Sequence, residues 1–263
     1  MNFNTLALFA LAIGPAASII IFFYAKDKND REPFGVLLMS FLAGCLSILP
    51  AIILEQALPF FVPGTNGFSL ISVAIYTFII IAASEEFSKF IFLRYYAYKK
   101  PSFNEPYDGI IYAVMVGMGF ATVENLMYIF GAESIGAAWG TAGLRALTAV
   151  PAHATFAAVM GYYVGLAKFN KANERSLLFR GFLLATILHG FYDFFLFQNQ
   201  TVGLYLGALA SLIIGIRFAL KAIKMHKLHT NAIRENTTVI NAPVEQTETI
   251  IQPDHFESPN KPK

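Results

Sequence analysis

Residues 70–94 read LISVAIYTFIIIAASEEFSKFIFLR, a long apolar run that contains two adjacent glutamates and a lysine. A helix of about 20 apolar residues is long enough to cross a bilayer. The run therefore predicts a membrane-spanning helix, and it places Glu85, Glu86 and Lys89 inside the hydrocarbon layer. Charged groups at that depth cost several kcal/mol each, so they are rare and usually functional.

The rest of the chain shares this membrane character. Of its 263 residues, 56% are hydrophobic and only 14% are charged, which is more apolar than a soluble domain of this length needs. A net charge of +2 gives no support for a nucleic-acid partner. The single cysteine, Cys45, excludes an intramolecular disulfide and a cysteine-based metal site. We expect an all-α, polytopic bundle in the lipid bilayer with about seven transmembrane helices, near residues 5–25, 34–54, 70–94, 108–130, 145–167, 178–197 and 202–221.

Lysine and arginine residues occur in every second one of the expected loops. Loops with these residues are 26–33, 95–107, 168–177 and the segment after 220. Loops without them are 55–69, 131–144 and 198–201. This is the distribution that the positive-inside rule predicts for seven spans. We therefore expect a multi-pass protein of the cell membrane, with its N-terminus outside and its C-terminus in the cytoplasm.

Two segments depart from the spanning pattern. Residues 131–144 are rich in glycine and only weakly apolar, which favours an interfacial or re-entrant piece over a span. The end of the chain is polar and has no hydrophobic period, as is typical of disorder. We divide the chain into an integral membrane domain, residues 1–225, and a disordered cytoplasmic tail, residues 226–263.

Further ionisable residues lie inside other expected spans: Glu124 in 108–130, His153 in 145–167, and His189 with Asp193 in 178–197. At about 1.5 Å of rise per residue, the three glutamates and two histidines all fall within the hydrocarbon layer, on four different helices. Isolated polar groups would have no partners at that depth. The sequence therefore predicts one shared interior site.

The spacings within two spans indicate what this site contains. Lys89 is one helical turn from both Glu85 and Glu86, so it can neutralise one glutamate and leave the other free. His189 and Asp193 are also one turn apart, so the carboxylate can orient the imidazole or join it at a metal. Two histidines with carboxylates suit zinc, whose catalytic sites keep one position for water. A glutamate beside that water suits a general base.

The motifs follow one another in a recognisable order: EEFSK at 85–89, FATVEN at 120–125, Arg145 leading to His153, and HGFYD at 189–193. This order resembles the PrsW family, in the superfamily that contains CAAX prenyl endopeptidases, and the resemblance covers roughly residues 80–195. It implies an intramembrane endopeptidase, classed with metalloproteases, that hydrolyses a peptide bond in or near a transmembrane segment of a membrane protein. The best-known relative acts on an anti-sigma factor in regulated proteolysis.

The resemblance also implies roles for individual residues. Glu85 or Glu86 would activate water, His153 and His189 would be metal ligands or oxyanion partners, and Glu124 would be a further ligand or base. The expected catalytic residues are Glu85, Glu86, Lys89, Glu124, His153 and His189. The expected metal ligands are Glu124, His153, His189 and Asp193. Zinc is the expected cofactor, and a metal-free glutamate–histidine site is the alternative.

Two other functions remain open from the residues alone. Buried glutamate, histidine and lysine side chains also build the proton relays of membrane transporters, although the chain has no inverted repeat to favour a carrier. A non-catalytic membrane scaffold is the other alternative, in which the polar cluster only holds the helices together. Hydrolysis of a membrane substrate would distinguish the protease from both.

Overall fold

The computed structural model describes residues 3–26, 31–65, 69–197 and 202–240, and these residues form helices and short connections without a β-strand. This confirms the expected all-α class. The helices are α1 Phe3–Lys26, α2 Phe34–Ala57, η1 Leu58–Phe60, α3 Leu70–Ile75, η2 Tyr76–Ala82, α4 Ala83–Tyr95, η3 Ala97–Lys99, α5 Asp108–Phe130, α6 Ile135–Leu147, α7 Ala149–Phe169, η4 Lys171–Asn173, α8 Glu174–Phe197 and α9 Val202–Ile240.

Six segments among the described residues are long and apolar enough to cross a membrane: Phe3–Ala25, Phe34–Phe60, Leu70–Lys99, Asp108–Phe130, Lys171–Phe197 and Leu206–Met225. The remaining expected span, 145–167, corresponds to α7, which has 21 residues. Most of α7 is buried among other helices, so small and polar side chains replace the large apolar ones that lipid would require. The bundle therefore agrees with the expectation of about seven spanning helices.

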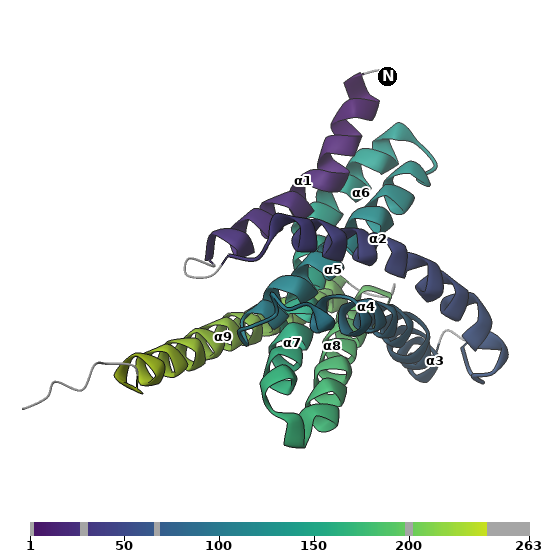
Figure 1. Ribbon diagram of the computed structural model, residues 1–263. Coiled ribbons are helices and arrows are strands. Elements are labelled where there is room, and N and C mark those ends of the chain that lie inside the picture. The colour runs from purple at the N-terminus through teal and green to yellow at the C-terminus, as the bar shows by residue number, and fades with distance from the viewer. Residues whose placement is uncertain (1–2, 27–30, 66–68, 198–201, 241–263) are drawn as a thin grey trace, which may run out of the picture.

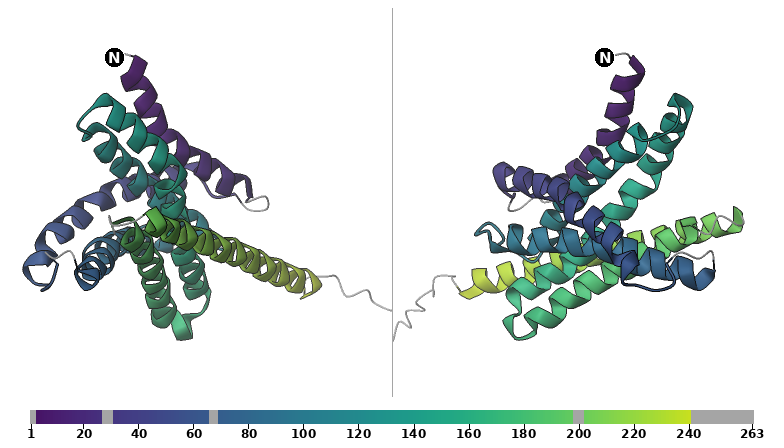
Figure 2. Two further views of the ribbon diagram at one scale, coloured as in Figure 1. Left: turned by 180° about the vertical axis from the view of Figure 1, so that it is seen from behind. Right: turned by 90° about the vertical axis from the view of Figure 1, so that its right-hand side faces the viewer.

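The centre of the bundle is α5, which packs against α1, α2, α6 and α7 (Figure 1). Helices α7 and α8 run side by side, and α9 packs on both and extends beyond the bundle (Figure 2). Most residues of α5 are buried. The functional side chains described below lie on α5, on helices that pack against it, and on α8, which packs against α4 and α7.

The expected boundaries differ from the observed ones in two places. The fifth span was expected to begin at Arg145, but Arg145 belongs to α6. The helix is interrupted at Thr148, and α7 begins at Ala149. Helix α6, within and after the glycine-rich segment, has 13 residues, too few to cross the hydrocarbon layer. It packs against α1, α5 and α7.

Helix α9 continues to Ile240, so no helix end marks the expected domain boundary at residue 226. Residues 241–263 lie outside the described part of the chain. The division into a membrane domain and a disordered tail stays a prediction.

Glycines bring α5 close to its neighbours. A Cβ atom on Gly119 would meet the backbone carbonyl of Phe41 on α2, and one on Gly44 would meet the backbone of Val116 on α5. On the other side of α5, Gly109 and Gly161 lie against each other's backbone. Small residues of this kind let membrane helices approach to backbone contact.

We expect Gly119→Ala to destabilise the bundle by about 1–3 kcal/mol, because backbone atoms of α2 must move to admit the methyl group. Thermal unfolding in detergent measures the effect. Gly140→Ala on α6 is the matched control, since nothing lies within 4 Å of its added Cβ. Equal melting temperatures for the two variants would contradict the close packing of α2 and α5.

Candidate active site

The two adjacent glutamates lie in the first turn of α4, directly after the π-helical segment η2. Segments of π-helix are rare and frequently occur at functional sites. Glu85 is 6% exposed and Glu86 is fully buried. The ammonium of Lys89 lies 3.1 Å from Glu85 Oε2 and 2.8 Å from Glu86 Oε1. The lysine therefore pairs with both glutamates, whereas the spacing alone suggested that it would neutralise one of them.

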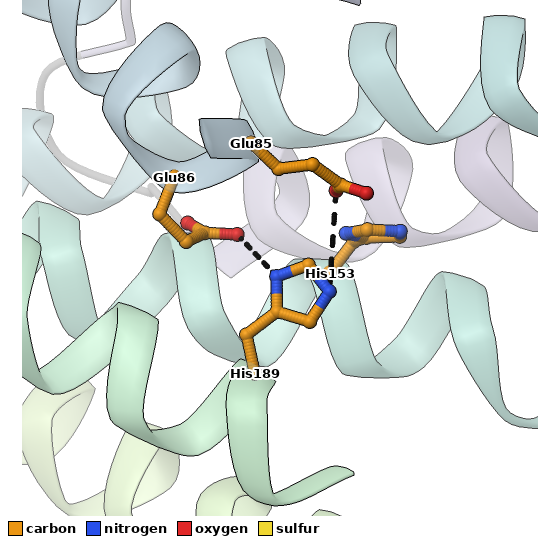
Figure 3. Close-up of side chains that lie close together, drawn as sticks. All are labelled: Glu85, Glu86, His153 and His189. Carbon is orange, nitrogen blue, oxygen red and sulfur yellow. Dashed lines mark hydrogen bonds and ion pairs between the residues drawn. The ribbon is translucent and has the colours of Figure 1, made fainter. Parts of the chain in front are cut away.

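Helix α8 brings His189 to these glutamates, as Figure 3 shows. Its Nδ1 lies 3.0 Å from Glu86 Oε1, and its Nε2 lies 3.9 Å from Glu85 Oε2. Asp193, one turn further along α8, places Oδ2 3.2 Å from the same Nε2. The expected contact between His189 and Asp193 is present, and it holds the imidazole plane across the two glutamates.

Helix α7 supplies His153, whose two ring nitrogens have different partners. Nε2 lies 2.7 Å from Glu124 Oε2 on α5, and Nδ1 lies 3.2 Å from Lys89 Nζ. An ammonium group can only donate hydrogen bonds, so Nδ1 accepts and Nε2 carries the proton that it donates to Glu124. The carboxylate of Glu124 thereby fixes the tautomer of His153.

Arg145 completes the contacts of Glu124. Its guanidinium donates to Glu124 Oε2 at 2.6 Å and to Asn125 Oδ1 at 2.7 Å. It also lies 4.2 Å from the ring centre of Tyr128. The structure therefore brings Arg145 into the site from α6, although the sequence alone placed it at the start of the span that carries His153.

Four of these side chains fit a metal ion: Glu85, Glu86, His153 and His189 each offer one ligand atom, and those atoms lie within 4.8 Å of one another. All four are buried, and Glu86 Oε2 is a buried oxygen without a hydrogen-bond partner. Two imidazoles with carboxylates form a donor set that suits zinc. The residues present therefore fit the metal that a metalloprotease requires.

Two of the expected metal ligands lie outside this group of four. Glu124 and Asp193 contact the ring nitrogens of His153 and His189 instead. Carboxylates in such positions orient the imidazoles that bind a metal. Their assignment as direct ligands stays a prediction.

Two cavities adjoin the site. One, of about 280 Å³, lies between α6, α7 and α8 and is bordered by Arg145, His153 and His189. The other, of about 380 Å³, lies between α2, η2 and α5. Glu85 and Glu124 border both cavities, so the site has room on two sides for an extended chain.

The second cavity contains a residue that the sequence analysis left out of the site. Glu55 was placed in a loop, one residue beyond the expected end of the second span, but it belongs to α2 and borders this cavity. It is the only charged residue between Phe34 and Phe60. That isolation within an apolar segment was the signal that could have identified it.

Comparison with known proteins identifies the family of the chain. The sequence profile of the PrsW family intramembrane metalloproteases matches residues 32–220. The chain belongs to the PrsW family. The match includes the glutamate pair, both histidines, Glu124 and Glu55. The expected family is therefore confirmed.

Curated PrsW relatives are similar over most of the chain. Protease PrsW of Geobacillus kaustophilus is 36% identical over 203 residues, which are 76% of this chain and 84% of the relative. The Clostridioides difficile protein is 40% identical over 194 residues, which are 73% of this chain and 79% of the relative. The Bacillus subtilis protein is 33% identical over 191 residues, which are 72% of this chain and 83% of the relative. No solved structure matches the chain.

The family and the six spanning segments show a multi-pass membrane protease, a hydrolase whose substrate is a protein. They favour this function over the transporter and the scaffold.

We expect Lys89→Met to destabilise the protein by about 3–5 kcal/mol, because Glu85 and Glu86 would lose their shared buried counter-charge. Thermal unfolding in detergent with a chelator measures the loss, and added Zn²⁺ should restore part of it by supplying a cation to the same carboxylates. Lys99→Met is the control, since Lys99 is exposed. A Lys89→Met protein as stable as this control would contradict the assigned ion pairs.

Proposed function

We propose that the chain is a zinc-dependent intramembrane endopeptidase that cleaves a membrane protein within or next to a transmembrane segment. The supporting observation is the buried group of Glu85, Glu86, His153 and His189 beside two cavities within the spanning helices. By similarity to the family, an anti-sigma factor in regulated proteolysis is the proposed substrate.

The proposed metal ligands are His153 and His189, together with Glu86. A zinc ion held there supplies Lewis acidity and makes water more acidic. The carboxylates of Glu124 and Asp193 hold the imidazoles in position. Lys89 limits the repulsion between the two glutamates by contacting both.

Glu85 is the proposed general base. It borders both cavities, whereas Glu86 borders neither and is fully buried against Lys89 and His189. Glu85 takes a proton from water as the water oxygen attacks the peptide carbonyl carbon. The same carboxyl then gives the proton to the departing amine nitrogen as the carbon–nitrogen bond breaks. A helical substrate must unwind locally, because its carbonyl carbon is otherwise shielded.

The site faces the outer side of the membrane in the proposed orientation. The cavities lie toward the C-terminal ends of α2, α5 and α8. The segments that follow these ends, 55–69, 131–144 and 198–201, contain no lysine or arginine, which favours an outer location. Water and substrate would therefore reach Glu85 from outside.

We expect purified protein in liposomes to cleave single-span substrates, and Glu85→Gln to lower the rate by at least about 100-fold through loss of the base. His153→Ala and His189→Ala should lose activity and bound zinc together. Chelation should abolish cleavage and zinc should restore it. Glu133→Gln, at an exposed position before α6, is the matched control. Activity that survives chelation in wild type would favour the metal-free site, and full activity in folded Glu85→Gln would remove the proposed base.

The orientation can be tested separately. A reporter enzyme that is active only outside the cytoplasm should be active when fused within 131–144 and inactive when fused within 168–177. The opposite pattern would invert the topology and place the site on the cytoplasmic side. Removal of residues 241–263 should leave cleavage intact if the end of the chain is a separate tail.

A further inference from the structure

The larger cavity is bordered by a carboxyl group that lies outside the candidate active site. Among the residues that border it, Glu55 is the only ionisable carboxylate outside the Glu85 and Glu124 site. Within the described part of the chain, Glu55 makes no hydrogen bond or ion pair, and its side chain is half-buried. Among the described residues, no lysine, arginine or histidine borders this cavity. The cavity therefore offers a carboxyl group that no cation of the described residues compensates.

A carboxylate in apolar surroundings is costly unless a partner compensates its charge. The wall around Glu55 is formed largely by apolar and aromatic side chains, among them Ile52, Met127, Tyr76 and Tyr128. Such a wall suits a long cationic side chain, whose hydrocarbon stem packs on aliphatic groups while its charge reaches the carboxylate. Tyrosine rings add cation–π attraction.

A second metal ion is a poorer match to this cavity. The one group of close metal-ligating side chains found among the described residues does not include Glu55. The smaller cavity differs as well, because its Arg145 is already paired with Glu124. The carboxylates that border the smaller cavity, Glu85, Glu124 and Asp193, all have ion-pair partners, whereas the larger cavity adds Glu55, which has none.

We propose that the larger cavity is a specificity pocket that takes a lysine or arginine side chain of the substrate, with Glu55 as the selecting residue. The inference rests on the proposed protease function and names a feature of its substrate. In the proposed orientation the pocket lies near the outer surface, where lysine and arginine beside a span are uncommon. Such a pocket would separate a few substrates from most membrane proteins.

The test uses single-span substrates in which one lysine is moved residue by residue across the outer end of the span. At the best position, lysine is then replaced by arginine, methionine or glutamate. We expect wild type to prefer lysine or arginine to methionine by at least about tenfold in kcat/KM, chiefly through KM, because a half-buried ion pair forms on binding.

Two substitutions of Glu55 decide the role. Glu55→Gln should cleave the lysine and methionine substrates with similar kcat/KM, and Glu55→Lys should prefer the glutamate substrate. Glu133→Gln and Glu133→Lys make the same charge changes at an exposed position and should keep the wild-type preference. Because each preference is a ratio within one variant, partial unfolding cancels. A preference for lysine that persists in Glu55→Gln and Glu55→Lys would overturn the assignment.

A binding measurement tests the pocket independently of the protease function. Fluorescence anisotropy of labelled substrate peptides in detergent measures affinity without hydrolysis. Tighter binding of the lysine peptide by wild type, lost in Glu55→Gln, supports the pocket even if no peptide is cut. Equal binding of the lysine, methionine and glutamate peptides overturns it, whatever the cleavage assay shows.

Discussion

The burial of Lys89 between Glu85 and Glu86 is the interaction on which the site depends. Three charged groups within two turns of α4 lie where neither water nor lipid can stabilise them. The pair with Lys89 is not sufficient, since the two carboxylates outnumber the one ammonium. The remaining negative charge requires a further partner, and His189 on α8 provides it at Glu86. His153 on α7 accepts a hydrogen bond from Lys89. One short polar stretch therefore obliges three helices to meet at one depth.

The apolar packing makes this meeting possible. Helix α5 carries Glu124 and also the glycines that let it contact α2 and α7 at backbone distance. Because α5 lies so close to α7, Glu124 can reach His153 directly. The glycine contacts and the carboxylate contact are thus parts of one arrangement. Larger residues on α5 would move Glu124 away from the imidazole that it orients.

The sequence predicted the spans and the shared site because charged residues in apolar runs are conspicuous, and burial leaves them few possible partners. It did not show which side chains lie close enough together to share a metal ion and which contact the imidazoles, because spacing within one helix says nothing about distances between helices. Glu55 was missed for a related reason, since a single carboxylate near a span end is ordinarily explained by exposure to water. Arg145 was placed on the wrong helix because residues 145–167 are apolar enough to be taken as one span, although Thr148 and Pro151 are typical of a helix start.

The difference between the two cavities bears on how a protease in the membrane selects one bond, because only the larger one contains a carboxylate without an ion-pair partner. A peptide chain has a direction, and a groove with identical ends would admit it in both directions. Here Glu55 lies on one side of Glu85 and the paired Arg145 lies on the other. A substrate with one cationic side chain can satisfy Glu55 in only one of these directions, since the reverse would bring that cation into the cavity whose carboxylates already have partners and would leave Glu55 without one. The same carboxylate that selects the residue would then fix the direction of the chain, and with it the carbonyl carbon that faces Glu85.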